Sequence, residues 1–250
     1  MNRINAFIVV VMLVLLSGCS NNKVDDDAKK IHFATSAEYP PFEYQGQWEI
    51  KGFDIDLAKL IAKKLGKEAV FDNMQFSSIL PALTSGRVQA AISTITITNE
   101  RKKNFDFSTP YYFEGMAAVF KKGSDITSPA KLKGKKLAAQ LGSTMEIWLK
   151  KHAANEPIFA MDNNNQAIEA LKAGHVDVVL MDGAQGAIFS EKNPGLTYTI
   201  IAKAEDGYGI ALEKGSPLTA QINQILNSLK KEGEIAKLQH TWLENSEWKI

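Results

Sequence analysis

The chain has 250 residues, of which 45% are hydrophobic and 23% are charged. This is ordinary globular composition, and the length allows one large domain or two of usual size. The formal net charge of +1, with no basic run longer than Arg101–Lys103, argues against a nucleic-acid-binding protein.

The N-terminus has the composition of a secretory signal. A basic start at Arg3 precedes an apolar run, Phe7–Leu16, which is too short to span a membrane but suits a signal peptide. The sequence LSGC at 16–19 resembles a bacterial lipobox, which implies cleavage before Cys19, the single cysteine, and a lipid on its thiol. An ordinary signal peptide with an incidental cysteine is the alternative. We expect a lipoprotein signal peptide at 1–18 and a polar, flexible tether at 19–30.

From Ile31 the chain alternates strands and helices. The apolar patterns predict strands at Ile31–Thr35, Ala69–Asn73 and Val88–Ser93, and helices at Phe53–Leu65 and Ser77–Ser85. A glycine follows each helix, as is usual where a helix ends. The order strand, helix, strand, helix, strand predicts a mostly parallel sheet covered by helices.

The second half of the chain repeats this order. We expect strands at Gly134–Gln140 and Val176–Met181, an extended segment at Gly209–Leu212, and helices at Met145–Ala153, Leu218–Lys230 and Glu234–Leu243. Residues 82–92 and 170–180 are identical at four of eleven positions, and each comprises a helix end, a glycine and a strand. The fold class is therefore α/β, with two similar units.

Polar residues follow the predicted strands of both units. Ser36, Ser93, Thr94, Ser143 and Asp182 each come just after the carboxyl end of a strand. Ligands of open α/β sheets bind at that edge. The sequence therefore predicts a ligand site in a cleft between the two units.

Arg101 lies at the start of a short helix within this pattern. Thr98 can cap that helix with its hydroxyl, and several hydroxyl residues precede it. A guanidinium held there has parallel donors that suit a carboxylate. A solvated arginine on a surface helix is the alternative.

Four motifs together resemble those of the polar amino-acid solute-binding proteins of bacterial ABC importers, closest to the arginine and lysine binders. They are ATSAEYPPFE at 34–43, GFDIDLA at 52–58, ITITNER at 95–101 and DFSTPYY at 106–112, and the resemblance covers the chain from Ile31 onward. It implies the two-lobed periplasmic-binding-protein fold, with lobe 1 at 29–114 and 209–250 and lobe 2 at 115–208, including the hinge segments. It also implies a monomer without cofactor or metal that delivers a free amino acid to permease and ATPase subunits, in the periplasm or at the cell surface.

The resemblance assigns a role to each site residue. It implies that Arg101 binds the ligand α-carboxylate with Thr96, Ser143 and Thr144, that Asp182 accepts the α-ammonium with Ser93 or Thr94, and that Tyr39 and Phe76 flank the ligand side chain. Gln140 is a further polar wall residue. Many relatives have an aspartate at the position of Ser36, and we hypothesise that Glu38 replaces that acid for the distal cation of arginine or lysine. A solvated Glu38 and a neutral ligand such as glutamine are the alternative.

Two other functional classes remain open from the sequence. The fold hosts occasional enzymes such as cyclohexadienyl dehydratase, but the four histidines are scattered and no nucleophile or phosphate-binding motif occurs, so we predict no enzyme. A chemosensory ligand presenter that feeds no transporter could use the same cleft.

Overall fold

The computed structural model describes residues 28–203 and 206–244. The predicted signal peptide, Cys19 and most of the tether lie outside the described residues. Within the described ranges, no helix combines the length and the apolar character of a membrane span. The elements are β1 (Lys30–Thr35), β2 (Glu38–Tyr39), β3 (Glu43–Gln45), β4 (Ile50–Lys51), α3 (Phe53–Lys64), β5 (Glu68–Asn73), α4 (Phe76–Thr84), β6 (Ala90–Ala91), α5 (Asn99–Asn104), β7 (Phe105–Phe107), β8 (Met116–Lys121), η1 (Pro129–Leu132), β9 (Leu137–Gln140), α6 (Thr144–His152), β10 (Ile158–Met161), α7 (Asn164–Ala173), β11 (Val178–Asp182), α8 (Gly183–Lys192), β12 (Leu196–Ala202), β13 (Ala211–Glu213), α9 (Leu218–Lys231), α10 (Glu234–Gln239) and η2 (His240–Glu244).

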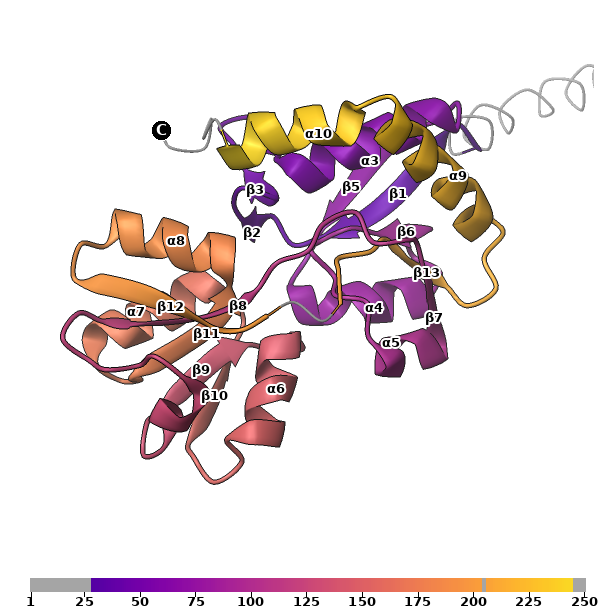
Figure 1. Ribbon diagram of the computed structural model, residues 1–250. Helices are drawn as coiled ribbons and strands as arrows, with labels where there is room; N and C mark the ends of the chain where they lie inside the picture. The colour runs from indigo at the N-terminus through magenta and orange to yellow at the C-terminus, as the bar shows by residue number, and fades with distance from the viewer. Residues whose placement is uncertain (1–27, 204–205, 245–250) are drawn as a thin grey trace, which may run out of the picture.

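Two five-stranded sheets divide the chain into two lobes (Figure 1). The sheet of lobe 1 has the order β5-β1-β6-β13-β7, and that of lobe 2 has the order β10-β9-β11-β8-β12. In lobe 1 only β13 opposes its neighbours, and in lobe 2 only β8 does. Both sheets are therefore mostly parallel and share one layout, which confirms the predicted α/β fold class.

Helices cover both faces of each sheet. In lobe 1, α3, α9 and α10 pack on one face around a core that includes Phe33 and Leu57, and α4 packs on the other face through Ile79 and Leu83. In lobe 2, α6 covers one face, and α7 and α8 cover the other. Each lobe thus has its own hydrophobic core between layers.

The predicted helix ends follow the glycine rule. Helix α7 ends at Gly174, whose φ of 79° is left-handed, and the equivalent Gly86 after α4 has a φ of 69°. Each glycine leads into a central strand, β11 or β6. The repeat between 82–92 and 170–180 therefore corresponds to the same place in both lobes.

Several predicted elements differ from the structure in length. The strand predicted at Val88–Ser93 forms only at Ala90–Ala91, because Ser93 and Thr94 leave the sheet in a tight turn in which Thr94 has a φ of 46°. The last helix ends at Gln239 and continues as the π-helix η2 instead of running to Leu243. The strands β8, β10 and β12 and the helix α8 were not predicted.

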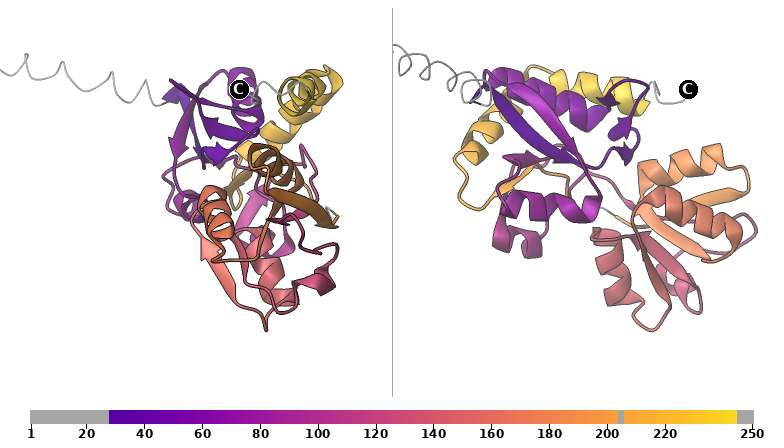
Figure 2. Two further views of the ribbon diagram at one scale, coloured as in Figure 1. Left: turned by 90° about the vertical axis from the view of Figure 1, so that its left-hand side faces the viewer. Right: turned by 180° about the vertical axis from the view of Figure 1, so that it is seen from behind.

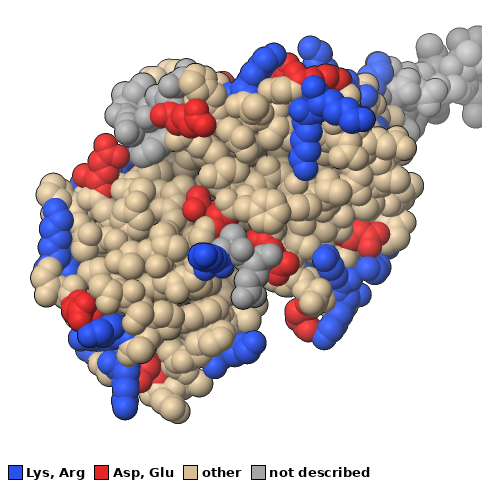
Figure 3. Space-filling model, in the orientation of Figure 1, with Lys and Arg blue, Asp and Glu red and all other residues tan. Residues whose placement is uncertain are grey.

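The chain crosses between the lobes twice, at residues that follow β7 and β12. The two crossings run side by side, with Tyr208 paired to both Tyr112 and Thr96 in antiparallel bridges. Two thin segments between the lobes are visible from behind (Figure 2). Acidic and basic side chains are interspersed over the face seen in Figure 3, in keeping with the near-zero net charge.

Candidate ligand-binding site

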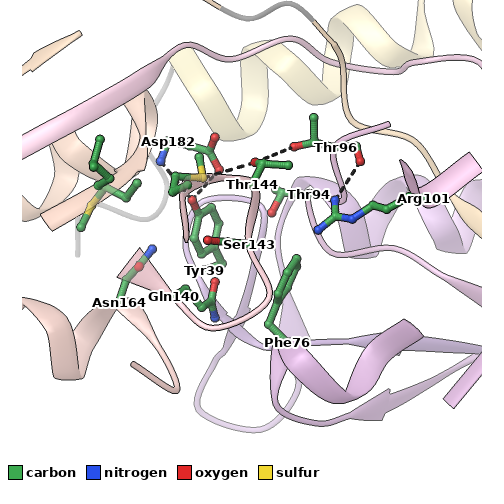
Figure 4. A pocket seen from close by; sticks show the side chains of 13 residues that line it. Tyr39, Phe76, Thr94, Thr96, Arg101, Gln140, Ser143, Thr144, Asn164 and Asp182 are labelled. Atoms are coloured by element: carbon green, nitrogen blue, oxygen red, sulfur yellow. Dashed lines mark hydrogen bonds between the residues drawn. The ribbon is translucent and has the colours of Figure 1, made fainter. Parts of the chain in front are cut away.

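A cavity lies between the lobes at the carboxyl ends of their strands (Figure 4). It is lined by Tyr39, Phe76, Thr94, Thr96, Arg101, Gln140, Ser143, Thr144, Met145, Asn164, Leu180, Met181 and Asp182. Nine of these residues are site residues that the sequence predicts. The other three, Ser36, Glu38 and Ser93, line an adjoining cavity that shares Tyr39, Phe76, Gln140 and Asn164 with the first. The structure thus brings all twelve predicted side chains to one region.

Arg101 is buried, and its guanidinium joins the two lobes. Its backbone N–H donates to the Thr98 hydroxyl at 3.1 Å, which caps α5 as predicted. Its side chain donates to the carbonyl oxygens of Thr96 at 2.8 Å and, across the cleft, of Gly142 at 3.0 Å. The guanidinium carbon lies 5.9 Å from the centre of the Phe76 ring.

The charge of Arg101 has no acidic partner within the described part of the chain. Burial lowers the pKa of Arg101 to about 10, so the guanidinium is still protonated at neutral pH. A buried cation without an anion is costly. The position therefore suits a ligand anion.

The first turn of α6 faces Arg101 from lobe 2. Gly142 turns the chain with a φ of 79°, and Ser143 caps the helix by accepting from the N–H of Glu146. The Thr144 hydroxyl lies 3.4 Å from the Thr96 hydroxyl of lobe 1. First-turn N–H groups have no partner within a helix and favour anions. Lobe 2 thus adds donors to the same anion site.

Asp182 lies on the other side of the cavity, at the end of β11 (Figure 4). The Tyr39 hydroxyl of lobe 1 donates to its Oδ2 at 2.5 Å. Burial raises the pKa of Asp182 to about 7, although the hydrogen bond from Tyr39 lowers it and the charge of Glu114 raises it further. A cation next to this carboxyl would favour its ionised form. The position suits an ammonium group.

The turn at Ser93 and Thr94 rests on two buried acids, Glu43 and Asp54, that the sequence does not predict as part of the site. The Ser93 hydroxyl donates to Glu43 at 2.7 Å and accepts from the N–H of Ser36, and the N–H of Thr94 donates to Asp54 at 2.8 Å. Burial raises the pKa of Asp54 to about 7 and that of Glu43 well above its usual range. These acids hold in place the turn that lines the site.

The remaining predicted residues line the rest of the two cavities, and of these Phe76 also lies against Arg101. Tyr39 and Phe76 line both cavities, and Gln140 donates to the Asp162 carbonyl at 3.4 Å. Glu38 lines the adjoining cavity but is exposed to solvent. Asn164, a buried residue at the start of α7, lines both cavities and was not predicted. Its only signal in the sequence is the run of three asparagines at the start of that helix.

The described residues contain no cluster of three or more histidine, cysteine or acidic side chains that could hold a metal ion. The polar groups of the site instead separate into a positive end at Arg101 and a negative group at Asp182. A zwitterion whose carboxylate and ammonium groups are attached to the same carbon matches such a site.

Comparisons with known proteins find relatives that cover most of the chain. Residues 31–245 match the model of the bacterial extracellular solute-binding proteins, family 3. The arginine-binding extracellular protein ArtP of Bacillus subtilis is 37% identical over 230 residues, or 90% of each chain. The L-cystine-binding protein TcyJ of Escherichia coli is 34% identical over 209 residues, or 82% of this chain and 79% of its own. The solved structure of an ancestral arginine-binding protein bound to arginine has a TM-score of 0.83 and 42% identity, and the match covers 86% of this chain and 98% of that one.

Proposed function

The chain belongs to the bacterial extracellular solute-binding proteins, family 3, and on that premise we propose that it captures arginine or lysine for an ABC importer. The family and the relatives are transport binding proteins, which confirms the prediction that the chain is not an enzyme. They also argue against a cyclohexadienyl-dehydratase-like activity. Of the two ligands we favour arginine, because ArtP and the ancestral protein are both named as arginine-binding proteins.

The observation that carries this proposal is the pair of buried ionisable groups that lack an oppositely charged partner. Arg101 has no acidic partner among the described side chains, and Asp182 has no basic one. An α-amino acid has a carboxylate and an ammonium on the same carbon and can neutralise both. Arg101 with Thr96, Ser143 and Thr144 then binds the carboxylate, and Asp182 with Ser93 or Thr94 binds the ammonium.

The ligand side chain then lies between Tyr39 and Phe76. Two aromatic rings can hold a guanidinium by stacking and cation–π contact, which contribute about 1–2 kcal/mol in a desolvated site. Glu38 lines the adjoining cavity, where no described hydrogen bond engages its carboxylate, and Gln140 and Ser36 supply polar walls. A neutral ligand such as glutamine is the alternative, in which Glu38 stays solvated.

Closure couples the two lobes to the ligand. We take 29–114 with 209–250 as lobe 1 and 115–208 as lobe 2, with hinges near Gly115 and Gly207. A ligand held by Arg101 of lobe 1 and Asp182 of lobe 2 contacts both only when the lobes are shut, so it favours the closed state. A lipid on Cys19 would keep the monomeric protein at a membrane next to its permease and ATPase. A chemosensory presenter would use the same closure without a permease.

Isothermal titration tests this function directly. The form starting at Ser20 is unfolded and refolded to remove carried-over ligand, then titrated with arginine, lysine, histidine, glutamine and cystine. Tight binding of arginine or lysine, weakened in Glu38→Gln, is the expected result. Tight glutamine or cystine binding with weak arginine binding would refute the basic ligand but keep the amino-acid site. Binding of none of them would refute the proposed function.

A further inference from the structure

We propose that Asn164 forms hydrogen bonds with the far end of the ligand side chain and thereby allows the site to accept either a guanidinium or a carboxamide there. The inference rests on the proposed function, because it assumes that an amino acid binds between Arg101 and Asp182. It adds a specificity-determining residue from lobe 2 to the groups already assigned.

Asn164 is a buried polar side chain with an unused hydrogen-bonding atom. It is 3% exposed, and its Oδ1 has no hydrogen-bond partner among the described residues. Leaving a buried amide oxygen unpaired is unfavourable, whereas a ligand donor would satisfy it. Its neighbours differ: Asn163 caps α7 by accepting from the N–H of Gln166, and Asn165 is exposed. Only the middle asparagine of the three is buried in the site.

The position of Asn164 matches the far end of a side chain whose carboxylate is bound by Arg101. Figure 4 shows Asn164 on the side of the cavity away from Arg101, near Gln140. It lines both the central cavity and the adjoining one, where Tyr39 and Phe76 also lie. A side chain that leaves the α-carbon between these two rings is therefore directed toward Asn164.

The chemistry of an amide predicts what this end accepts. The side chain of Asn164 has an acceptor and two donors, and a rotation of its terminal group exchanges them. It can accept from the N–H groups of a guanidinium or exchange both kinds of hydrogen bond with a carboxamide. A carboxylate at the same place would accept only and would add a charge, so it would favour the cation and reject the neutral ligand.

The test compares arginine and glutamine affinities by titration in the wild type, Asn164→Asp and Asn165→Asp. The two variants add the same charge one residue apart on α7, but only residue 164 is buried in the site. In Asn164→Asp the arginine-to-glutamine affinity ratio should rise about tenfold or more, through stronger arginine binding and weaker glutamine binding. In Asn165→Asp the ratio should stay within about twofold of the wild type.

A third variant, Asn164→Leu, keeps the size of the side chain without its polar atoms. It should weaken arginine and glutamine alike, by about tenfold, because the ligand end loses its partner. Thermal unfolding of the ligand-free variants verifies that each is folded. Equal ratios in the two aspartate variants, or wild-type affinities in Asn164→Leu, would refute the role of Asn164 while the function stands. A wild type that binds no amino acid would instead refute the function.

Discussion

Under the proposed function, a proton and the ligand ammonium compete for the buried carboxyl group of Asp182. Its pKa is raised to about 7 by burial, so much of it is protonated in the ligand-free protein below that pH. An ammonium needs the ionised form, so binding must release the proton. We predict that arginine affinity rises about tenfold per pH unit from pH 5 to 7 and levels off above.

Titration calorimetry at pH 5, 6, 7 and 8 measures this slope, and two buffers of different ionisation heat count the released protons. Asp182→Asn should bind more weakly and show no slope in this range. Asp54 also has a pKa raised to about 7, and Glu43 and Glu114 lie in the same region, so Asp54→Asn is the matched comparison. If the slope disappears in Asp54→Asn but persists in Asp182→Asn, the released proton comes from Asp54 and the prediction for Asp182 is wrong.

Arg101 is the residue whose loss should affect binding most. Arg101→Ala leaves the ligand carboxylate without its cation, which costs about 3–5 kcal/mol of binding free energy. Arg101→Lys keeps the charge but not the parallel donors and should fall in between. Arg87→Ala is the control, because Arg87 is an exposed arginine of the same lobe. Wild-type affinity in Arg101→Ala, measured by titration, would show that the ligand binds elsewhere.

At the residue scale, the sequence predicts those site side chains whose position follows from a short local motif. The Thr98 cap and Arg101 follow from four consecutive residues, and the structure contains both. Glu43 and Asp54 lie within recognised motifs, but their burial depends on packing beneath the Ser93 turn, which no local pattern encodes. Asn164 was missed because the strand before it, β10, was not predicted.

At the scale of elements, the short helix α5 orients the guanidinium. Its cap is the hydrogen bond from the N–H of Arg101 to the Thr98 hydroxyl. Thr98→Ala should lower the free energy of unfolding by about 1 kcal/mol and also weaken arginine binding, because the helix start carries Arg101. Thr98→Ser keeps the hydroxyl and should retain most of both. Chemical denaturation and titration measure the two effects, and an unchanged affinity in Thr98→Ala would separate the cap from the site.

The elements that the sequence predicts well are those with local signals. Helix α3 begins at Phe53 and ends just before Gly66 as its apolar period and its glycine indicate. The strands β8 and β12 pair antiparallel with each other although about eighty residues of sequence separate them. Such a pairing depends on tertiary contacts and not on local sequence signals. The early end of β6 depends in turn on the contacts of Ser93 and Thr94 with buried acids.

For the whole molecule, closure depends on contacts between the lobes. Besides the cavity residues, the Gln185 amide on α8 donates to the carbonyl oxygen of Pro40 in lobe 1. Gln185→Ala removes a buried lobe–lobe hydrogen bond, which contributes about 1 kcal/mol, and should shift the ligand-free protein toward open forms. Small-angle scattering should then give a larger radius of gyration without ligand and the wild-type value with saturating arginine. Gln166→Ala, at an exposed position of lobe 2, should change neither.

The place of β13 in the sheet of lobe 1 determines the order in which the chain can complete its fold. All five strands of lobe 2 lie between residues 116 and 202, so that sheet is complete before the C-terminal segment has been synthesised. In lobe 1, β13 lies between β6 and β7, and it can pair with them only after residues 211–213 have been synthesised. Until then β6 and β7 have open edges, which are prone to pair with other chains. We therefore expect the sheet of lobe 1 to be completed after that of lobe 2, and a chain truncated before Ala211 to have a whole lobe 2 beside an aggregation-prone lobe 1.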